Sequence, residues 1–200
     1  VNEVAVYPAE DDESRILAQD KRRGGNAANT SVVLSQLGHE CYWAGTLVTE
    51  SDCQIILDDF EDYQINIDYA QFLAKGKIPT SYISVSRETA SRTISHYRDL
   101  PEYRFSEFQK INLHNFDWLH FEGRNIEHTD KMIRYAKQNY PQLTISVELE
   151  KPREGIERLI EFADIIIFSK HYARSNDFHS AVQFLQQFKM QNNDKAFICA

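Results

Sequence analysis

Apolar and polar positions alternate along the chain with two periods, one typical of buried strands and one typical of amphipathic helices. Short apolar runs between polar residues predict strands, and longer stretches with apolar residues three or four apart predict helices. The predicted strands are residues 41–47, 116–121, 143–149, 163–168 and 196–199. The predicted helices are residues 26–37, 53–63, 127–139, 153–162 and 178–191, with Ser51 capping the second helix and Gly38 closing the first.

The order of these elements indicates the fold class. Regular alternation of strands and helices predicts an α/β fold with a mostly parallel sheet and helices on both faces. Residues 1–19 and 67–97 break the alternation, because their strand-like runs have no helix between them. Such runs predict a small antiparallel β flap that covers a site or makes a dimer contact. The α/β core would then comprise residues 20–66 and 98–200.

Composition narrows the class of protein. The chain has 200 residues, of which 42% are hydrophobic, enough for one sizeable core. A net charge of −8 argues against a nucleic-acid or anionic-membrane surface, and no apolar run approaches the roughly 20 residues of a membrane helix. The three cysteines lack metal-binding spacing and predict buried thiols in a reducing cytoplasm, and the seven histidines show no metal-binding pattern.

The stretch RRGGNAANT, residues 22–30, holds the densest candidate chemistry. Gly24 and Gly25 remove two side chains just before a predicted helix, so that the backbone can bend tightly and approach a ligand. Asn26 and Asn29 are three residues apart on the first helical turn, and each amide can donate to and accept from a hydroxyl, which suits a neutral polyol. The preceding arginines could steer an anion, although the Lys-Ser/Thr of a phosphate loop is missing. The alternative is an asparagine-capped helix that binds nothing.

The segment GGNAAN, followed by LSQLG, resembles the first signature of the ribokinase-type (PfkB) carbohydrate kinases. Within that family the chain is similar to the ketohexokinases along essentially all of its length. Matching stretches are Tyr7-Pro8 with Glu10-Asp11, Leu57-Asp58-Asp59, Ser91-Arg92-Thr93-Ile94, the HFEGRN that starts at His120, the VE at Val147, the EKPRE at Glu150, and Ser169-Lys170. The resemblance implies a ribokinase-like fold in which Gly24, Gly25, Asn26 and Asn29 hold the hydroxyls of a sugar.

The same resemblance implies roles for two residues of the flap. The arginine that matches Arg92 lies beside the transferred phosphoryl group, where a guanidinium neutralises developing charge. The aspartate that matches Asp11 reaches the sugar site of a second subunit in a homodimer formed through the flap, with Asp12 as the alternative register. Without the resemblance, Arg92 and Asp11 would be interpreted as solvated surface charges.

Charged residues also follow two of the predicted strands, where open α/β sheets bind ligands. Resemblance places Glu122 and Arg124 beside the sugar and phosphate, whereas an ion-pair cluster opening the next helix is the alternative. Many ribokinase-type enzymes carry an Asn-x-x-Glu motif near Lys170, but this chain has SKHYA there, and the ketohexokinases depart in the same way. Lys170 would meet a nucleotide phosphate as a point charge.

The implied activity is transfer of the γ-phosphoryl group of ATP, as its Mg2+ complex, to a ketose such as fructose, giving the sugar 1-phosphate. Another kinase of the family, acting on ribose, a nucleoside or a sugar phosphate, is an alternative, as is an inactive sugar-binding relative. The family takes its catalytic base from an Asp-Thr-x-Gly-Ala-Gly-Asp segment, which this sequence does not contain. We therefore expect a fragment that lacks the first strand and the catalytic segment and is inactive by itself.

Overall fold

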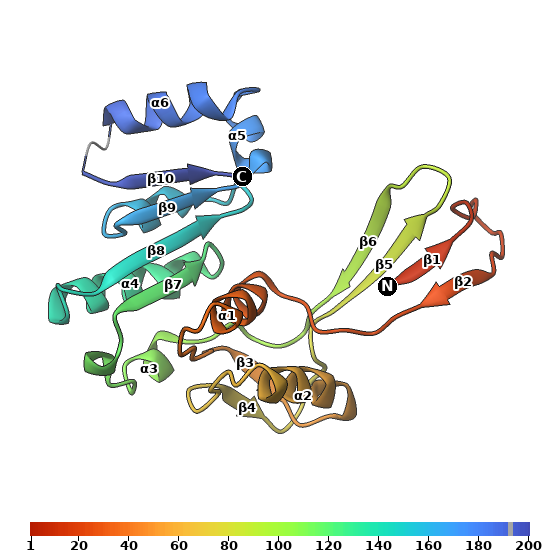
Figure 1. Ribbon diagram of the computed structural model, residues 1–200, viewed down its shortest axis with the longest axis horizontal. Helices are drawn as coiled ribbons and strands as arrows, with labels where there is room; N and C mark the ends of the chain where they lie inside the picture. The colour runs from red at the N-terminus through yellow and green to blue at the C-terminus, as the bar shows by residue number, and fades with distance from the viewer. Residues whose placement is uncertain (192–193) are drawn as a thin grey trace. The chain divides into compact units, whose positions relative to one another are not determined.

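The computed structural model describes residues 1–191 and 194–200 and divides the chain into two compact units, Val1–Glu102 and Tyr103–Ala200. Each unit contains its own sheet or sheets (Figure 1) and its own buried apolar residues. The two units are therefore described one after the other. Among the described residues, no helix combines the length and the apolar character that crossing a membrane requires.

The first unit contains a four-stranded sheet in the order β2-β1-β5-β6 (Figure 1). The outer pairs, β1 with β2 and β5 with β6, are antiparallel, whereas β1 and β5 run parallel. This sheet corresponds to the predicted flap, with one parallel pair in place of a purely antiparallel arrangement. Its strands are β1 (Asn2–Val4), β2 (Ile16–Gln19), β5 (Thr80–Ser86) and β6 (Arg92–Tyr97).

A second, two-stranded sheet corrects two of the sequence predictions. Strand β4 (Gln71–Leu73) pairs in parallel with β3 (Thr46–Val48), so this part of residues 67–97 does not belong to the four-stranded sheet. The predicted strand 41–47 is also much shorter than expected. A Cβ atom at Gly45 would lie only 2.3 Å from the indole ring of Trp43, which packs against Phe60 and so bends the chain ahead of β3. The assignment of the remaining residues to a core and a flap stays a prediction.

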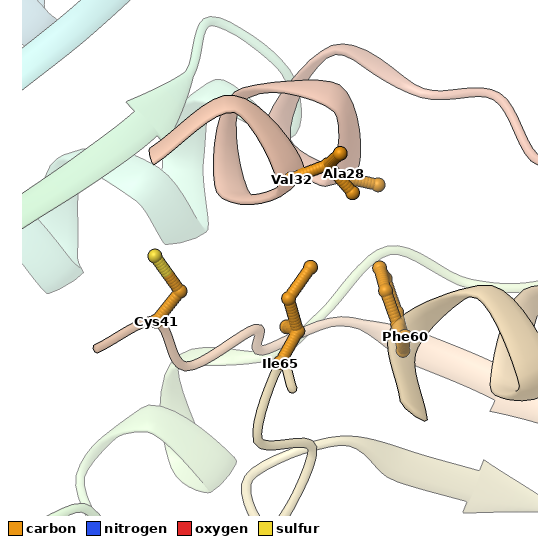
Figure 2. Packing of buried hydrophobic residues seen from close by; sticks show 5 residues of the cluster. All are labelled: Ala28, Val32, Cys41, Phe60 and Ile65. Carbon is orange, nitrogen blue, oxygen red and sulfur yellow. The ribbon is translucent and has the colours of Figure 1, made fainter. Parts of the chain in front are cut away.

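Two helices, α1 (Asn26–Gln36) and α2 (Gln54–Asp62), pack on a shared apolar cluster in this unit. Figure 2 shows the buried side chains of that cluster, Ala28, Val32, Cys41, Phe60 and Ile65. Because Ala28 and Val32 are one turn apart on α1, their burial orients the first turn of the helix and leaves its other face open.

The ends of these helices test two predicted caps. Gly38 closes α1 as predicted: it has φ 90, its N–H donates to the carbonyl of Ser35, and the following N–H of His39 donates to Leu34, which is a Schellman motif. The prediction that Ser51 caps the second helix is wrong. Ser51 is the first residue of a 3-10 turn, η1 (Ser51–Cys53), and the N-cap position belongs to Glu50. The Glu50 carboxylate instead accepts the Ile78 N–H at 2.5 Å.

The second unit confirms the predicted parallel sheet with flanking helices. Its four strands run parallel in the order β10-β9-β8-β7, and the inward residues of β8, including Ile145 and Val147, are fully buried (Figure 1). The strands are β7 (Trp118–Glu122), β8 (Thr144–Leu149), β9 (Ile165–Phe168) and β10 (Ala196–Cys199). The helical segments are α3 (Phe105–Phe108), η2 (Leu113–Asn115), α4 (Ile126–Asn139), η3 (Ile156–Ile160), α5 (Lys170–Ser175) and α6 (Ala181–Gln191).

Two helical segments of this unit differ from the prediction. The expected helix 153–162 is only the 3-10 turn η3, because Gly155 takes a left-handed conformation with φ 73 and delays the start until Ile156. Helix α5 was not predicted. It begins after Ser169, whose hydroxyl accepts the N–H of Tyr172 at 2.9 Å.

Candidate functional site

The two glycines before α1 serve different purposes. Gly25 occupies the N-cap position with φ 99 and ψ 134, a conformation that is essentially restricted to glycine. Gly24 has no such constraint, and a Cβ atom built on it would meet no heavy atom within 4 Å. The fold therefore requires glycine at residue 25, whereas nothing within the described chain prevents a side chain at residue 24. The space beside Gly24 is open to a ligand.

Asn29 is held by a polar contact that sequence reasoning missed. Arg23 donates from Nη1 to Asn29 Oδ1 at 2.8 Å, and its Nε forms an ion pair with Asp59 on α2. Only 9% of the Arg23 side chain is exposed, and its guanidinium lies 5.8 Å from the ring centre of Phe60. Because the carbonyl oxygen of Asn29 is engaged, its amide NH2 group is the part left to donate to a ligand.

Each of the two arginines that were expected to steer an anion has an acidic partner. Arg23 is neutralised by Asp59 and largely covered, and the exposed Arg22 pairs with Asp20 at 2.6 Å. The signal for Asp59 was present in the matching stretch Leu57-Asp58-Asp59. Asn26, the other predicted amide, is partly buried at the first position of α1.

Asp11 and Arg92 lie at the same end of the four-stranded sheet. Val4 at the end of β1 is opposite Ser86 at the end of β5, and β6 starts at that end with Arg92 opposite Val85. Asp11 lies in the loop that follows β1 and has φ 62. Both side chains are exposed. The predicted functional residues of the flap are thus brought to one edge, although their strands are separated by about 80 residues in the sequence.

Glu122 and Arg124 form an ion pair at the carboxyl end of β7. Arg124 Nε donates to Glu122 Oε2 at 2.9 Å, with 36% and 21% of the two side chains exposed. Between them, the N–H of Gly123 donates to the carbonyl of Glu148 at 2.7 Å, and a Cβ atom at Gly123 would lie 2.7 Å from the same oxygen. Glycine is therefore needed to let β7 and β8 approach closely at their ends. Nε is engaged by Glu122, and an arginine carries four further N–H donors.

Lys170 lies at the same edge of this sheet. It is the first residue of α5, separated from β9 only by Ser169, and β8 lies between β9 and β7 in the sheet. The Lys170 side chain is exposed, and its backbone N–H donates to the carbonyl of Ala200 at 2.7 Å. It borders a hollow of about 130 Å³ that Arg174, His179 and Cys199 also line. A basic side chain at the carboxyl edge of a parallel sheet is suited to an anionic group.

The role of a partly buried histidine on β7 was also missed by sequence reasoning. His120 Nδ1 lies 2.8 Å from the hydroxyl of Ser146, which accepts the indole N–H of Trp118 at 2.8 Å. Burial lowers the pKa of His120 from its ordinary value of 6.5, and the nearby Glu122 opposes that shift. The alternation of β7 places His120 on the same face as Glu122. That spacing and the matching stretch HFEGRN were the available signals.

Among the residues that the structure describes, no three histidine, cysteine, aspartate or glutamate side chains gather closely enough to hold a metal ion. The predicted site residues thus fall into three groups. One is at the start of α1, one at the end of the four-stranded sheet, and one at the carboxyl edge of the parallel sheet.

Comparison with known proteins decides the family. The model of the pfkB family carbohydrate kinases matches residues 2–197. The chain belongs to the pfkB family of carbohydrate kinases. Mouse ketohexokinase is one relative, 36% identical over 193 residues, a match that covers 93% of this chain and 65% of the mouse protein. The chain therefore spans about two thirds of the length of this pfkB relative.

Solved structures support the fold of this pfkB family member. A putative ribokinase from Agrobacterium tumefaciens matches with a TM-score of 0.80 at 14% identity, covering 99% of this chain and 65% of that one. The ribokinase of Arabidopsis thaliana, solved with ribose and ATP, matches with a TM-score of 0.76 at 11% identity over 99% of this chain and 67% of that one. At such identities the likeness shows the ribokinase-like fold and nothing finer.

Proposed function

We propose that the protein containing this chain is an ATP-dependent ketohexokinase, which transfers the γ-phosphoryl group of ATP to a ketose such as fructose and gives the sugar 1-phosphate. The observation that carries the proposal is the 36% identity to mouse ketohexokinase over 93% of the chain. The open backbone at Gly24 and the outward amide of Asn29 support a site for an uncharged, hydroxyl-rich ligand.

In this proposal the start of α1 binds the sugar. Gly24 lets the substrate approach the backbone, the amide of Asn26 exchanges hydrogen bonds with the sugar hydroxyls, and the NH2 group of Asn29 donates to them. Arg23 and Asp59 fix Asn29, so that the amide is oriented before the sugar arrives. Such fixed orientation lowers the entropic cost of bringing the hydroxyl into line with the phosphoryl group.

Charged residues serve the phosphoryl group. Arg92 neutralises the charge that develops during transfer, and Arg124, oriented by Glu122, supplies further N–H donors beside the sugar and phosphate. Lys170 meets a phosphate of ATP from the carboxyl edge of the parallel sheet. ATP enters as a co-substrate, and Mg2+ enters with it as the counter-ion of its phosphates.

We further infer that the flap forms a homodimer in which Asp11 contributes to the sugar site of the partner. Every residue of the two edge strands, β2 and β6, is exposed, including Leu17 and Ile94. Edge strands that each have one side open for pairing and expose apolar side chains favour association with another sheet.

An ADP-release assay on the complete protein tests the function. Fructose, ribose, adenosine and fructose 6-phosphate are compared, and we expect fructose to give the highest kcat/KM. Higher turnover with ribose, the nucleoside or the sugar phosphate would assign another activity of the family. An absence of turnover with all four would indicate a sugar-binding relative. The 200-residue chain alone should be inactive, because its sequence lacks the segment that supplies the family's general base.

A further inference from the structure

Tyr7 forms the most extensive side-chain contact near the predicted residues of the flap. Its hydroxyl donates to the carbonyl of Ser91 at 2.7 Å and lies 3.3 Å from the carbonyl of Ser84, and the Ser91 hydroxyl donates back to it at 3.2 Å. One phenol therefore joins the segment after β1 to β5 and to the residue that precedes β6. A tyrosine hydroxyl that is both donor and acceptor fixes its position more strictly than a single bond would.

The hairpin contact lies directly beside Arg92. Ser91 immediately precedes Arg92, and the Ser91 carbonyl also accepts the Ser86 N–H at 3.1 Å, which closes the hairpin ladder. Ser84 is opposite Thr93 in the register of β5 and β6. Tyr7 therefore contacts Ser91, which precedes Arg92, and Ser84, which is opposite Thr93. The phenol therefore anchors the segment after β1 at the start of β6.

The segment that follows Tyr7 in the chain is the loop that carries Asp11. Between Tyr7 and Ile16, the described hydrogen bonds are local ones, Asp12 N–H to the Ala9 carbonyl and Glu13 N–H to the Asp12 carboxylate. The hydroxyl of Tyr7 is thus the last long-range attachment before Asp11, four residues further on. A loop held only at its ends takes its position from those ends.

We propose that Tyr7 is a positioning residue that sets the Asp11 loop against the strand that begins at Arg92. The proposal rests on the proposed kinase function, and it assigns to Tyr7 no direct contact with a substrate. Because Asp11 and Arg92 have exposed side chains on separate segments, their relative placement depends on a connection of this kind.

Tyr7→Phe in the complete protein removes the hydroxyl and keeps the ring. Tyr63→Phe is the matched control, since Tyr63 is a half-buried tyrosine of the same unit whose ring packs on the α1–α2 cluster. Hydrogen–deuterium exchange should be faster in Tyr7→Phe for the peptides that cover residues 8–15 and 87–93, and unchanged in Tyr63→Phe. This readout requires no kinase activity.

Kinetics test the role in catalysis. Tyr7→Phe should lower kcat/KM for the sugar about tenfold, the effect of roughly one lost hydrogen bond. In an Asp11→Ala background the same change should have less than about a twofold effect, because the loop no longer carries its carboxylate. Unchanged exchange, unchanged kcat/KM, or fully multiplicative effects of the two substitutions would each overturn the role of Tyr7. Wild-type protein inert toward every sugar would instead overturn the function itself.

Discussion

At the scale of single residues, the adjacent Gly24 and Gly25 differ in their purpose: the fold requires glycine at residue 25, whereas glycine at residue 24 leaves space for a ligand. Gly25 has a positive φ that other residues adopt only with strain, whereas Gly24 has room for a side chain. The sequence alone presents them as an equivalent pair. Only the backbone conformation distinguishes them, because no local sequence rule specifies which of two consecutive glycines takes the special dihedral angles.

Alanine at each glycine tests this distinction. Gly25→Ala should lower the free energy of unfolding by about 1–3 kcal/mol, the cost of the strained conformation. Gly24→Ala should change it by less than about 0.5 kcal/mol and yet weaken fructose binding about tenfold or more. Urea unfolding and calorimetric titration of the complete protein measure the two quantities. Undiminished fructose affinity in Gly24→Ala would mean that no ligand approaches the backbone there.

The partly buried His120 should make the free energy of unfolding depend on pH. Its pKa in the folded protein is below the ordinary value of 6.5, chiefly because burial disfavours the charged ring, with the Glu122 carboxylate opposing this. Below about pH 6.5 the unfolded chain takes up a proton that the folded chain does not, so the free energy of unfolding falls as pH decreases from there toward the folded pKa.

Urea unfolding at about pH 7.5 and about pH 5.5 should therefore show a smaller loss of stability in His120→Gln than in the wild type. His39→Gln, the same substitution at an exposed histidine, is the control. A wild-type pH dependence that persists fully in His120→Gln would assign the effect to other groups.

At the scale of elements, the sequence was most informative where burial follows a simple period. The strands of the parallel sheet and the helix α4 were predicted to within a few residues, because β8 carries buried apolar residues at Ile145, Val147 and Leu149 and α4 carries a regular apolar stripe. The predictions failed where one residue overrides the pattern. Gly155 delays the helix expected from residue 153, and Trp43 folds against Gly45 and shortens the strand expected from residue 41.

Strand pairing was the second feature of the elements that the sequence did not predict. The strand-like run that became β4 has the same alternating character as β5 and β6, so the sequence assigned all three to the flap. Pairing in sheets is decided by contacts between distant segments, and these leave little trace in local composition. The parallel pairing of β1 with β5 was hidden for the same reason.

At the scale of the whole molecule, the chemistry of the candidate residues was easier to predict than their contacts with residues far away in the sequence. The glycines, the asparagines and the charged residues after the strands were identified from the sequence, with the resemblance to a kinase family supplying their roles. The contacts of Arg23 with Asp59 and of Tyr7 with Ser91 were not, because each joins residues far apart in the chain. Contacts of this kind can be identified only from the tertiary structure.

The exposed flap leads to a prediction about assembly. Ile94 is 48% exposed on the edge strand β6, and Val182 is 65% exposed on α6, well outside the flap. If two copies associate through their flaps, a lysine at residue 94 places an unpaired charge in the contact, whereas a lysine at residue 182 does not. In sedimentation velocity, Ile94→Lys of the complete protein should therefore shift from dimer toward monomer and Val182→Lys should remain dimeric. Loss of the dimer should also raise the KM for the sugar, because Asp11 would no longer reach a partner's site.

A monomeric wild type, or an Ile94→Lys variant that stays dimeric, would contradict association through the flap.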